Sequence, residues 1–199
     1  TLECDLIVAG IGVVPATQWL AGSGIELLQG SVLCDATLAT NVPDIVAAGD
    51  VVRWPNAAMD DQVINVEHWS NAVEQGQAAA ARLLDGPGVE PYRHLPYFWS
   101  DQYDRKYQST GRVRSDDTFE VVKGQLDQAS FAAIFGREGR FVSVLTSNAP
   151  GVFLRARKLL AQLTHERHPL GIRGVCVGLV AGDFVKDRGE VVWRGRQPA

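Results

Sequence analysis

The chain has 199 residues, which is enough for one or two domains, and 46% hydrophobic and 21% charged residues are typical of a soluble globular protein. The net charge of −4 argues against a nucleic-acid-binding protein, which is usually basic. No apolar run reaches the roughly 18 residues of a membrane span. The first residues carry no basic region of the kind that opens a signal peptide. We therefore expect neither nucleic acid nor a membrane among its partners.

The cysteines and histidines give no sign of a redox or metal centre. Cys4, Cys34 and Cys176 are far apart and form no C-x-x-C pair, so neither a redox dithiol nor a zinc ribbon is indicated. An odd number of scattered cysteines is typical of a reducing compartment, and we expect a cytoplasmic protein. His165 and His168 lie close in sequence but have no further candidate ligands beside them. We predict no metal site.

The first apolar segment, C-D-L-I-V-A at residues 4–9, predicts a strand. It is followed by G-I-G-V-V-P at residues 10–15, which is similar to a dinucleotide-binding fingerprint. That fingerprint has a third glycine where this chain has Pro15, and the glycine normally permits close packing of helix on strand. We therefore do not interpret this loop as a pyrophosphate site.

The next notable segment is T-N-V-P-D-I-V-A-A-G-D-V at residues 40–51. Its apolar residues 45–47 predict a short strand, which Gly49 ends and Asp50 follows. A glycine at the end of a buried strand lets a ligand approach the backbone. A carboxylate there lies at the strand's carboxyl end, where open α/β sheets bind ligands. The alternative is an ordinary turn aspartate. The polar residues 51–62 that follow are expected to form an exposed loop or hairpin.

A long amphipathic helix is predicted over residues 70–84, capped by Ser70 or Asn71 and ended by Gly86. Glu67 lies just before it, where a negative charge is favoured by the helix dipole. The residues expected on its apolar face share helical spacing. They are Trp69, Ala72, Val73, Gly76, Ala79, Ala80, Leu83 and Leu84.

The remainder of the chain predicts antiparallel strands and one more helix. A polar connector, residues 89–94, with the nearby prolines Pro91 and Pro96, fits a domain boundary. The aromatic string P-Y-F-W-S-D-Q-Y then begins at Pro96. Strands are predicted in residues 106–113, 118–123, 129–135 and 141–145, and a helix in residues 152–163. The expected apolar positions of this helix are Val152, Phe153, Ala156, Leu159, Leu160 and Leu163.

Three of these strings, in this order, resemble motifs of the FAD-dependent pyridine-nucleotide reductases. Residues 40–51 resemble their second flavin-binding motif, residues 67–76 (E-H-W-S-N-A-V-E-Q-G) the start of a flavin-facing helix, and residues 96–103 the entry to their C-terminal domain. Residues 4–21 are similar to the crossover between the NAD(P) and FAD domains. Within the family, the resemblance is to the oxygenase-coupled ferredoxin reductases, and it extends from Cys4 to about Leu160.

The resemblance implies roles for residues around an FAD. Asp50 would hydrogen-bond the ribityl chain, and Gly49 would allow the close approach. The amino end of the helix that follows Glu67 would point at the N1 and O2 edge of the flavin. His68 and Trp69 would meet the isoalloxazine ring. The alternatives are a core aromatic for Trp69 and an unpartnered, non-functional histidine for His68.

Trp99 would lie beside the dimethylbenzene edge of the flavin, towards the docking surface of an iron–sulfur partner. The alternative is that Trp99 and its aromatic neighbours form the core of a small sheet.

The implied fold class is α/β plus α+β. We expect the second half of a Rossmann-like FAD-binding domain in residues 1–95, an antiparallel sheet with a helix in residues 96–163 as the C-terminal reductase domain, and an unmatched tail in residues 164–199. Most of the NAD(P)H site and the first half of the FAD site would lie outside this chain.

The implied function is that of a C-terminal fragment of an NAD(P)H:ferredoxin oxidoreductase, inactive alone. The alternative is a non-catalytic assembly module that has lost its cofactor and self-associates as a homo-oligomer. A nitrite-reductase or NADH-oxidase type of flavoprotein is a third option, against which the string from Pro96 argues.

Overall fold

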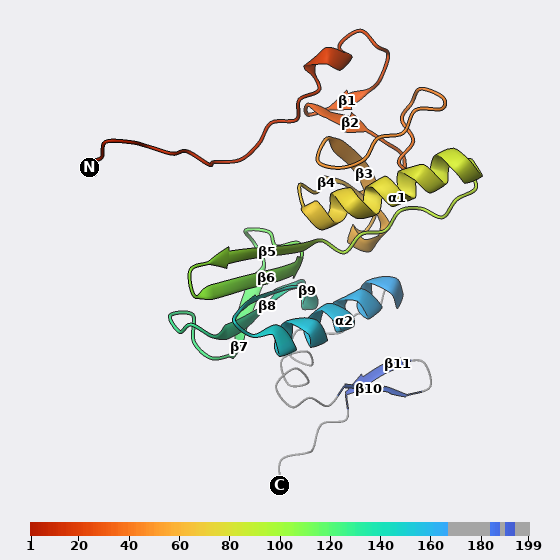
Figure 1. Ribbon diagram of the computed structural model, residues 1–199. Coiled ribbons are helices and arrows are strands. Elements are labelled where there is room, and N and C mark those ends of the chain that lie inside the picture. Colours follow the sequence, from red (N-terminus) through yellow and green to blue (C-terminus); the bar gives the residue numbers. More distant parts are fainter. Residues whose placement is uncertain (167–183, 188–189, 194–199) are drawn as a thin grey trace.

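The computed structural model describes residues 1–166, 184–187 and 190–193 (Figure 1). Within these residues one sheet has the order β1-β2-β3-β4, and a second has the order β5-β6-β9-β8-β7. Helix α1 (Trp69–Asp85) follows the first sheet, and helix α2 (Pro150–Glu166) follows the second. The predicted combination of α/β and antiparallel α+β elements is confirmed. No helix in the described part of the chain is long and apolar enough to cross a membrane.

The first sheet is small and mixed. β1 (Leu27–Leu28) and β2 (Ser31–Leu33) form a hairpin, β2 pairs in parallel with β3 (Val52–Asn56), and β3 pairs antiparallel with β4 (Gln62–Asn65). Short 3-10 turns lie at η1 (Gln18–Leu20) and η2 (Ala57–Met59). Residues of β3 alternate between buried and half-buried, as expected for a strand that packs one face on a core.

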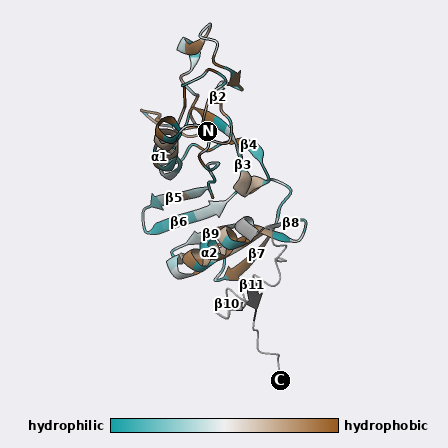
Figure 2. Cartoon of the chain, turned by 90° about the vertical axis from the view of Figure 1, so that its right-hand side faces the viewer, coloured by the Kyte–Doolittle hydropathy of each residue, from teal (hydrophilic) through white to brown (hydrophobic). Residues whose placement is uncertain are grey.

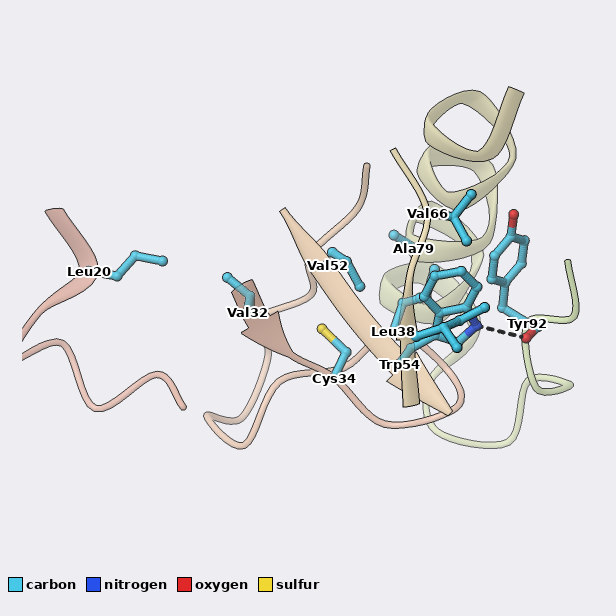
Figure 3. Close-up of a cluster of buried hydrophobic side chains, with 10 residues drawn as sticks. Leu20, Val32, Cys34, Leu38, Val52, Trp54, Val66, Ala79 and Tyr92 are labelled. Atoms are coloured by element: carbon cyan, nitrogen blue, oxygen red, sulfur yellow. Dashed lines mark hydrogen bonds between the residues drawn. The ribbon is translucent and has the colours of Figure 1, made fainter. Parts of the chain in front are cut away.

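The core of this first unit is built around Trp54, which is fully buried (Figure 3). Its indole Nε1 donates a 3.3 Å hydrogen bond to the Tyr92 carbonyl, so the connector after α1 is fixed to β3. The other buried members come from the sheet, its loops and α1. They are Leu20, Val32, Cys34, Leu38, Val52, Ile64, Val66, Ala79 and Tyr92. The prediction that residues 51–62 are exposed is therefore wrong, although the hairpin is confirmed.

Helix α1 has the predicted extent but not the predicted orientation. His68 rather than Ser70 or Asn71 is its N-cap residue, and Gly86 ends it with a φ of +83°. The buried residues of α1 are Asn71, Gln75 and Ala79. Most of the predicted apolar face is exposed, in particular Trp69, Val73, Gly76, Ala80, Leu83 and Leu84. The two amides are buried because they satisfy polar groups of neighbouring loops, which outweighs the apolar pattern.

The second sheet is antiparallel throughout. Four of its five strands agree with the predicted ones, and the fifth, β5, forms from the aromatic string that begins at Pro96. The five strands are β5 (Tyr97–Gln102), β6 (Arg105–Gly111), β7 (Thr118–Lys123), β8 (Phe131–Arg137) and β9 (Arg140–Ser147). Helix α2 packs along this sheet (Figure 1). All six predicted apolar positions of α2 are buried: Val152, Phe153, Ala156, Leu159, Leu160 and Leu163. Figure 2 shows both brown and teal stretches along α2, which is therefore a helix of mixed polar and apolar residues.

Two predicted strands are not present. Residues 4–9 form no strand, and Leu6, Ile7 and Val8 are 79–88% exposed, because no neighbouring strand pairs with this segment. Figure 1 shows it extending away from the body of the protein. Residues 45–47 contain a single bridge, from Val46 to Ala39, rather than a strand. A strand requires a paired neighbour, which hydrophobicity alone does not guarantee.

The tail is described only in part. β10 (Phe184–Asp187) and β11 (Glu190–Trp193) form an antiparallel pair. Most of the unmatched segment 164–199, including His168 and Cys176, lies outside the described residues.

Candidate functional site

Gly49 and Asp50 form a turn that packs against α1. Gly49 has a φ of +87°, and its N–H donates a 2.7 Å hydrogen bond to Oε1 of the fully buried Gln75. A Cβ at Gly49 would lie 3.6 Å from the Ala72 Cβ. The Asp50 carbonyl accepts a 2.7 Å hydrogen bond from the Asn65 side chain, while its carboxylate is left exposed. The turn is thus fixed through its backbone and presents a free acidic group.

The amino end of α1 lies beside this turn. The His68 side chain makes no capping hydrogen bond, and the first turn contains no acidic residue. The first N–H groups of a helix have no partners within the helix, and the helix dipole places partial positive charge there. Glu67 is exposed just before the start. This geometry can stabilise a negative charge that develops on a bound group.

His68 is half-buried in front of β5. Its ring centroid is 5.5 Å from that of Phe98, and its Nδ1 is buried without a hydrogen-bond partner in the described chain. Burial lowers the pKa of His68, an effect that His94 strengthens and the Asp50 carboxylate opposes. The ring is therefore neutral at pH 7 and retains an unused polar atom.

Trp69 and Trp99 form an exposed aromatic pair. Their rings meet edge to face at 6.3 Å, and Trp99 stacks on Tyr97 at 5.3 Å. Trp69 is 72% exposed, so the alternative of a core aromatic is wrong for it. Trp99 is 37% exposed and is only partly covered by the sheet. Ser70 also donates a 3.3 Å hydrogen bond to the Tyr97 carbonyl, which ties the start of α1 to β5.

A cleft of about 530 Å³ lies between the segment before α1 and the second sheet. Glu67 and His68 line one side, Pro96 and Phe98 another, and Gly111 part of the floor. Gly49, Asp50, Trp69 and Trp99 do not line it. The structure therefore brings the six predicted residues to one end of α1, with two of them inside the cleft and four beside it.

Sequence reasoning missed the buried polar side chains that hold this end of α1 in place. Tyr92 OH donates to Asn71 Oδ1 at 3.1 Å, and Asn71 Nδ2 donates to the Val66 carbonyl at 2.9 Å. His94 Nδ1 lies 2.8 Å from Glu74 Oε2. The sequence offered one indication of these buried side chains: the amides Asn71 and Gln75 lie one helical turn apart in an alanine-rich helix.

The described cysteines take no part in this site. Cys34 is buried in the first core, and burial raises the pKa of its thiol to about 12, so it stays protonated. In the described part of the chain no three residues among His, Cys, Asp and Glu are grouped so that they could hold a metal ion.

Comparison with known proteins gives two family matches. Residues 1–76 match the family described as pyridine nucleotide-disulphide oxidoreductase, and residues 97–168 match the family described as reductase C-terminal. These two matches, one after the other along the chain, make it similar to the FAD-dependent pyridine-nucleotide reductases. It corresponds to the C-terminal portion of the ferredoxin reductases in this family.

Individual relatives support the assignment. The chain is 33% identical over 161 residues to the ferredoxin–NAD(P)(+) reductase fdr of Sphingomonas sp.. This alignment covers 80% of the chain and 38% of that protein. The crystal structure of Fdr9 superposes with a TM-score of 0.71 at 36% identity, over 80% of this chain and 41% of that one. The covalent putidaredoxin reductase–putidaredoxin complex superposes with a TM-score of 0.75 at 26% identity, over 91% of this chain and 43% of that one.

These relatives are much longer than the chain. It spans between 26% and 40% of the length of curated relatives such as mouse apoptosis-inducing factor 3 and the putidaredoxin reductase CamA of Pseudomonas putida.

Proposed function

We propose that this chain is the C-terminal part of an FAD-dependent NAD(P)H:ferredoxin oxidoreductase, and that by itself it provides half of a flavin site. The observation that carries the proposal is the convergence of the Gly49–Asp50 turn, the amino end of α1 and the Trp69–Trp99 pair. These three features come from separate strings of the sequence. When bound, FAD supplies the capacity to accept a hydride and release single electrons.

The described residues fit a flavin. The free carboxylate of Asp50 is a hydrogen-bond acceptor for a ribityl hydroxyl, and the turn at Gly49 is held open by its bond to Gln75. The uncapped N–H groups after His68 would stabilise negative charge at the N1 and O2 edge of the ring. The exposed face of Trp69 provides an apolar surface of the size of an aromatic ring.

The parent protein would take electrons from NAD(P)H and deliver them to an iron–sulfur protein of the ferredoxin type. The solved complex of a related reductase with putidaredoxin supports a protein partner of this type. Trp99, next to Trp69 on the exposed side of β5, would lie on the flavin edge nearest that partner. We propose the domain boundaries that the sequence predicts, with the flavin-binding part in residues 1–95 and the reductase C-terminal domain in residues 96–163.

A flavin-binding titration tests the proposal. We expect the 199-residue chain to quench FAD fluorescence weakly and saturably, to lose the yellow flavin absorbance on desalting, and not to oxidise NADH. Asp50→Ala should weaken the quenching. Asp104→Ala is the matched control, because Asp104 is an acidic residue in the turn between β5 and β6 and should have no effect. Robust NADH oxidation with added FAD, or identical quenching by the Asp50 variant, would refute the proposal.

The alternative, a self-associating module without cofactor, is supported by exposed apolar side chains. Leu6, Ile7 and Val8 on the N-terminal segment and Leu84 on α1 are all at least 79% exposed. Exposed apolar surface of this kind is usually covered by a partner. Sedimentation velocity distinguishes the flavoprotein fragment from the self-associating module. A colourless, stable oligomer that does not quench FAD fluorescence would favour the module.

A further inference from the structure

A second cavity, of about 330 Å³, lies between η2, the β8–β9 hairpin and the C-terminal half of α2. It shares only Arg112 with the cleft in front of His68. Its lining has two chemically distinct parts, an apolar floor and a rim of arginines.

The floor of this cavity is a rigid apolar surface. Phe141 on β9 and Leu160 and Leu163 on α2 are buried members of the core under the second sheet. Met59 contributes a further apolar side chain from η2. Because these residues belong to the packed core, the cavity has an apolar floor whose position is set by that core.

The rim carries three guanidinium groups with different partners. Arg137 is held by Asp117 through two hydrogen bonds, Nε to Oδ1 at 2.7 Å and Nη2 to Oδ2 at 2.8 Å, so its charge is already matched. It also donates to the Arg112 carbonyl at 3.1 Å and thereby fixes the backbone that carries the second arginine. Within the described residues, the side chains of Arg112 and Arg140 form no hydrogen bond or ion pair. Asp60 is the acidic residue of the lining.

We propose that this cavity binds a small organic monoanion with a compact apolar body, of the aromatic carboxylate class. Among the described residues of the lining, the guanidinium groups of Arg112 and Arg140 have no paired carboxylate, and Asp60 is the one acidic side chain. The rim therefore has an excess of positive charge. Arginine is suited to bidentate contact with a carboxylate, and the apolar floor suits a ring. A volume of this size is at the lower end of the range for ligand sites, which limits the occupant to one ring with short substituents.

The alternatives fit less well. An inorganic anion would leave the floor formed by Phe141, Leu160 and Leu163 without a partner, and a neutral aromatic would leave both arginines unmatched. The proposal does not depend on flavin binding, because none of the six flavin-site candidates lines this cavity.

The test is a titration of the 15N-labelled 199-residue chain with sodium benzoate, followed by 1H–15N NMR. Benzyl alcohol and acetate serve as ligand controls, one lacking the charge and the other the ring. We expect saturable shifts at residues of the cavity with benzoate only. Arg112→Gln and Arg140→Gln should each weaken binding by about tenfold or more, since a charged hydrogen bond is lost. Both side chains are exposed, so the fold should be retained.

Lys158→Gln is the matched control variant, because Lys158 is an exposed cation of α2 outside the lining. It should bind benzoate as the parent chain does. Shifts of equal size with acetate or with benzyl alcohol would overturn the proposal, as would unchanged benzoate affinity in an Arg112→Gln and Arg140→Gln double variant.

Discussion

Gly111→Ala is expected to be among the most damaging single-methyl additions to this chain. Gly111 ends β6 with a φ of +88°, and its N–H donates to the Pro96 carbonyl at 3.0 Å. A Cβ there would lie 2.1 Å from the Val142 carbonyl oxygen, 2.9 Å from the Ser143 Cα and 3.0 Å from the Leu160 Cδ2. The first two neighbours are backbone atoms of β9, so relief requires the strand itself to move.

Two costs add at this position. The left-handed backbone conformation costs an alanine about 1–2 kcal/mol. Forcing a methyl group into a packed region costs about 1–3 kcal/mol more. We therefore expect a loss of roughly 2–5 kcal/mol, a large share of the roughly 5–15 kcal/mol that stabilises a typical domain.

Gly139→Ala provides the matched control. Gly139 has a φ of +77°, similar to that of Gly111, but a Cβ there would meet nothing within 4 Å. Its expected cost is the conformational part alone, about 1–2 kcal/mol. Urea unfolding of both variants, followed by circular dichroism, measures the difference. Equal losses in the two variants would refute the reasoning, because the backbone contact would then carry no cost.

Three further predictions concern α1 and its surroundings. Tyr92→Phe should lower the free energy of unfolding by about 1–3 kcal/mol in urea titrations, because the buried Asn71 Oδ1 loses its donor; a loss too small to measure would contradict this. Burial lowers the pKa of His94 below 6.5, so its neutral form stabilises the fold above about pH 6.5 and this stability is lost as the pH falls towards the lowered value. Unfolding measured between pH 5 and 8 should depend less on pH in His94→Gln, with His68 causing the remaining slope; an unchanged slope would count against the assignment. Trp69→Ala should change stability by no more than about 0.5 kcal/mol yet reduce FAD quenching, and a large stability loss would show a structural role instead.

The second sheet could be predicted well because its core is complete within the chain. The apolar positions of α2 have helical spacing, and all six are buried in clusters that also contain residues from strands of the same sheet. Local pattern and tertiary packing therefore agree, which is the condition under which periodicity is most informative.

The N-terminal segment and α1 could not be predicted in the same way. Residues 4–9 have the composition of a buried strand, but whether a strand forms depends on a neighbour that the pattern does not specify. In α1 the apolar stripe through Val73 and Leu84 is exposed, while Asn71 and Gln75 face the core. Hydrophobic periodicity assigns polar residues to the surface and so misses amides that are buried to satisfy loops.

Polar side chains of α1 hold parts of the three separate strings together in the structure. Gln75 holds the N–H of Gly49, so α1 fixes the position of the Asp50 turn. Ser70 bonds the Tyr97 carbonyl, so the same helix also fixes β5, where Trp99 lies beside Trp69. We expect a substitution at Gln75 to displace the turn and weaken flavin binding without altering any residue that we propose to contact the cofactor. The site is then defined by the helix that connects its parts, and the acidic turn, the uncapped helix start and the tryptophan pair cannot shift independently.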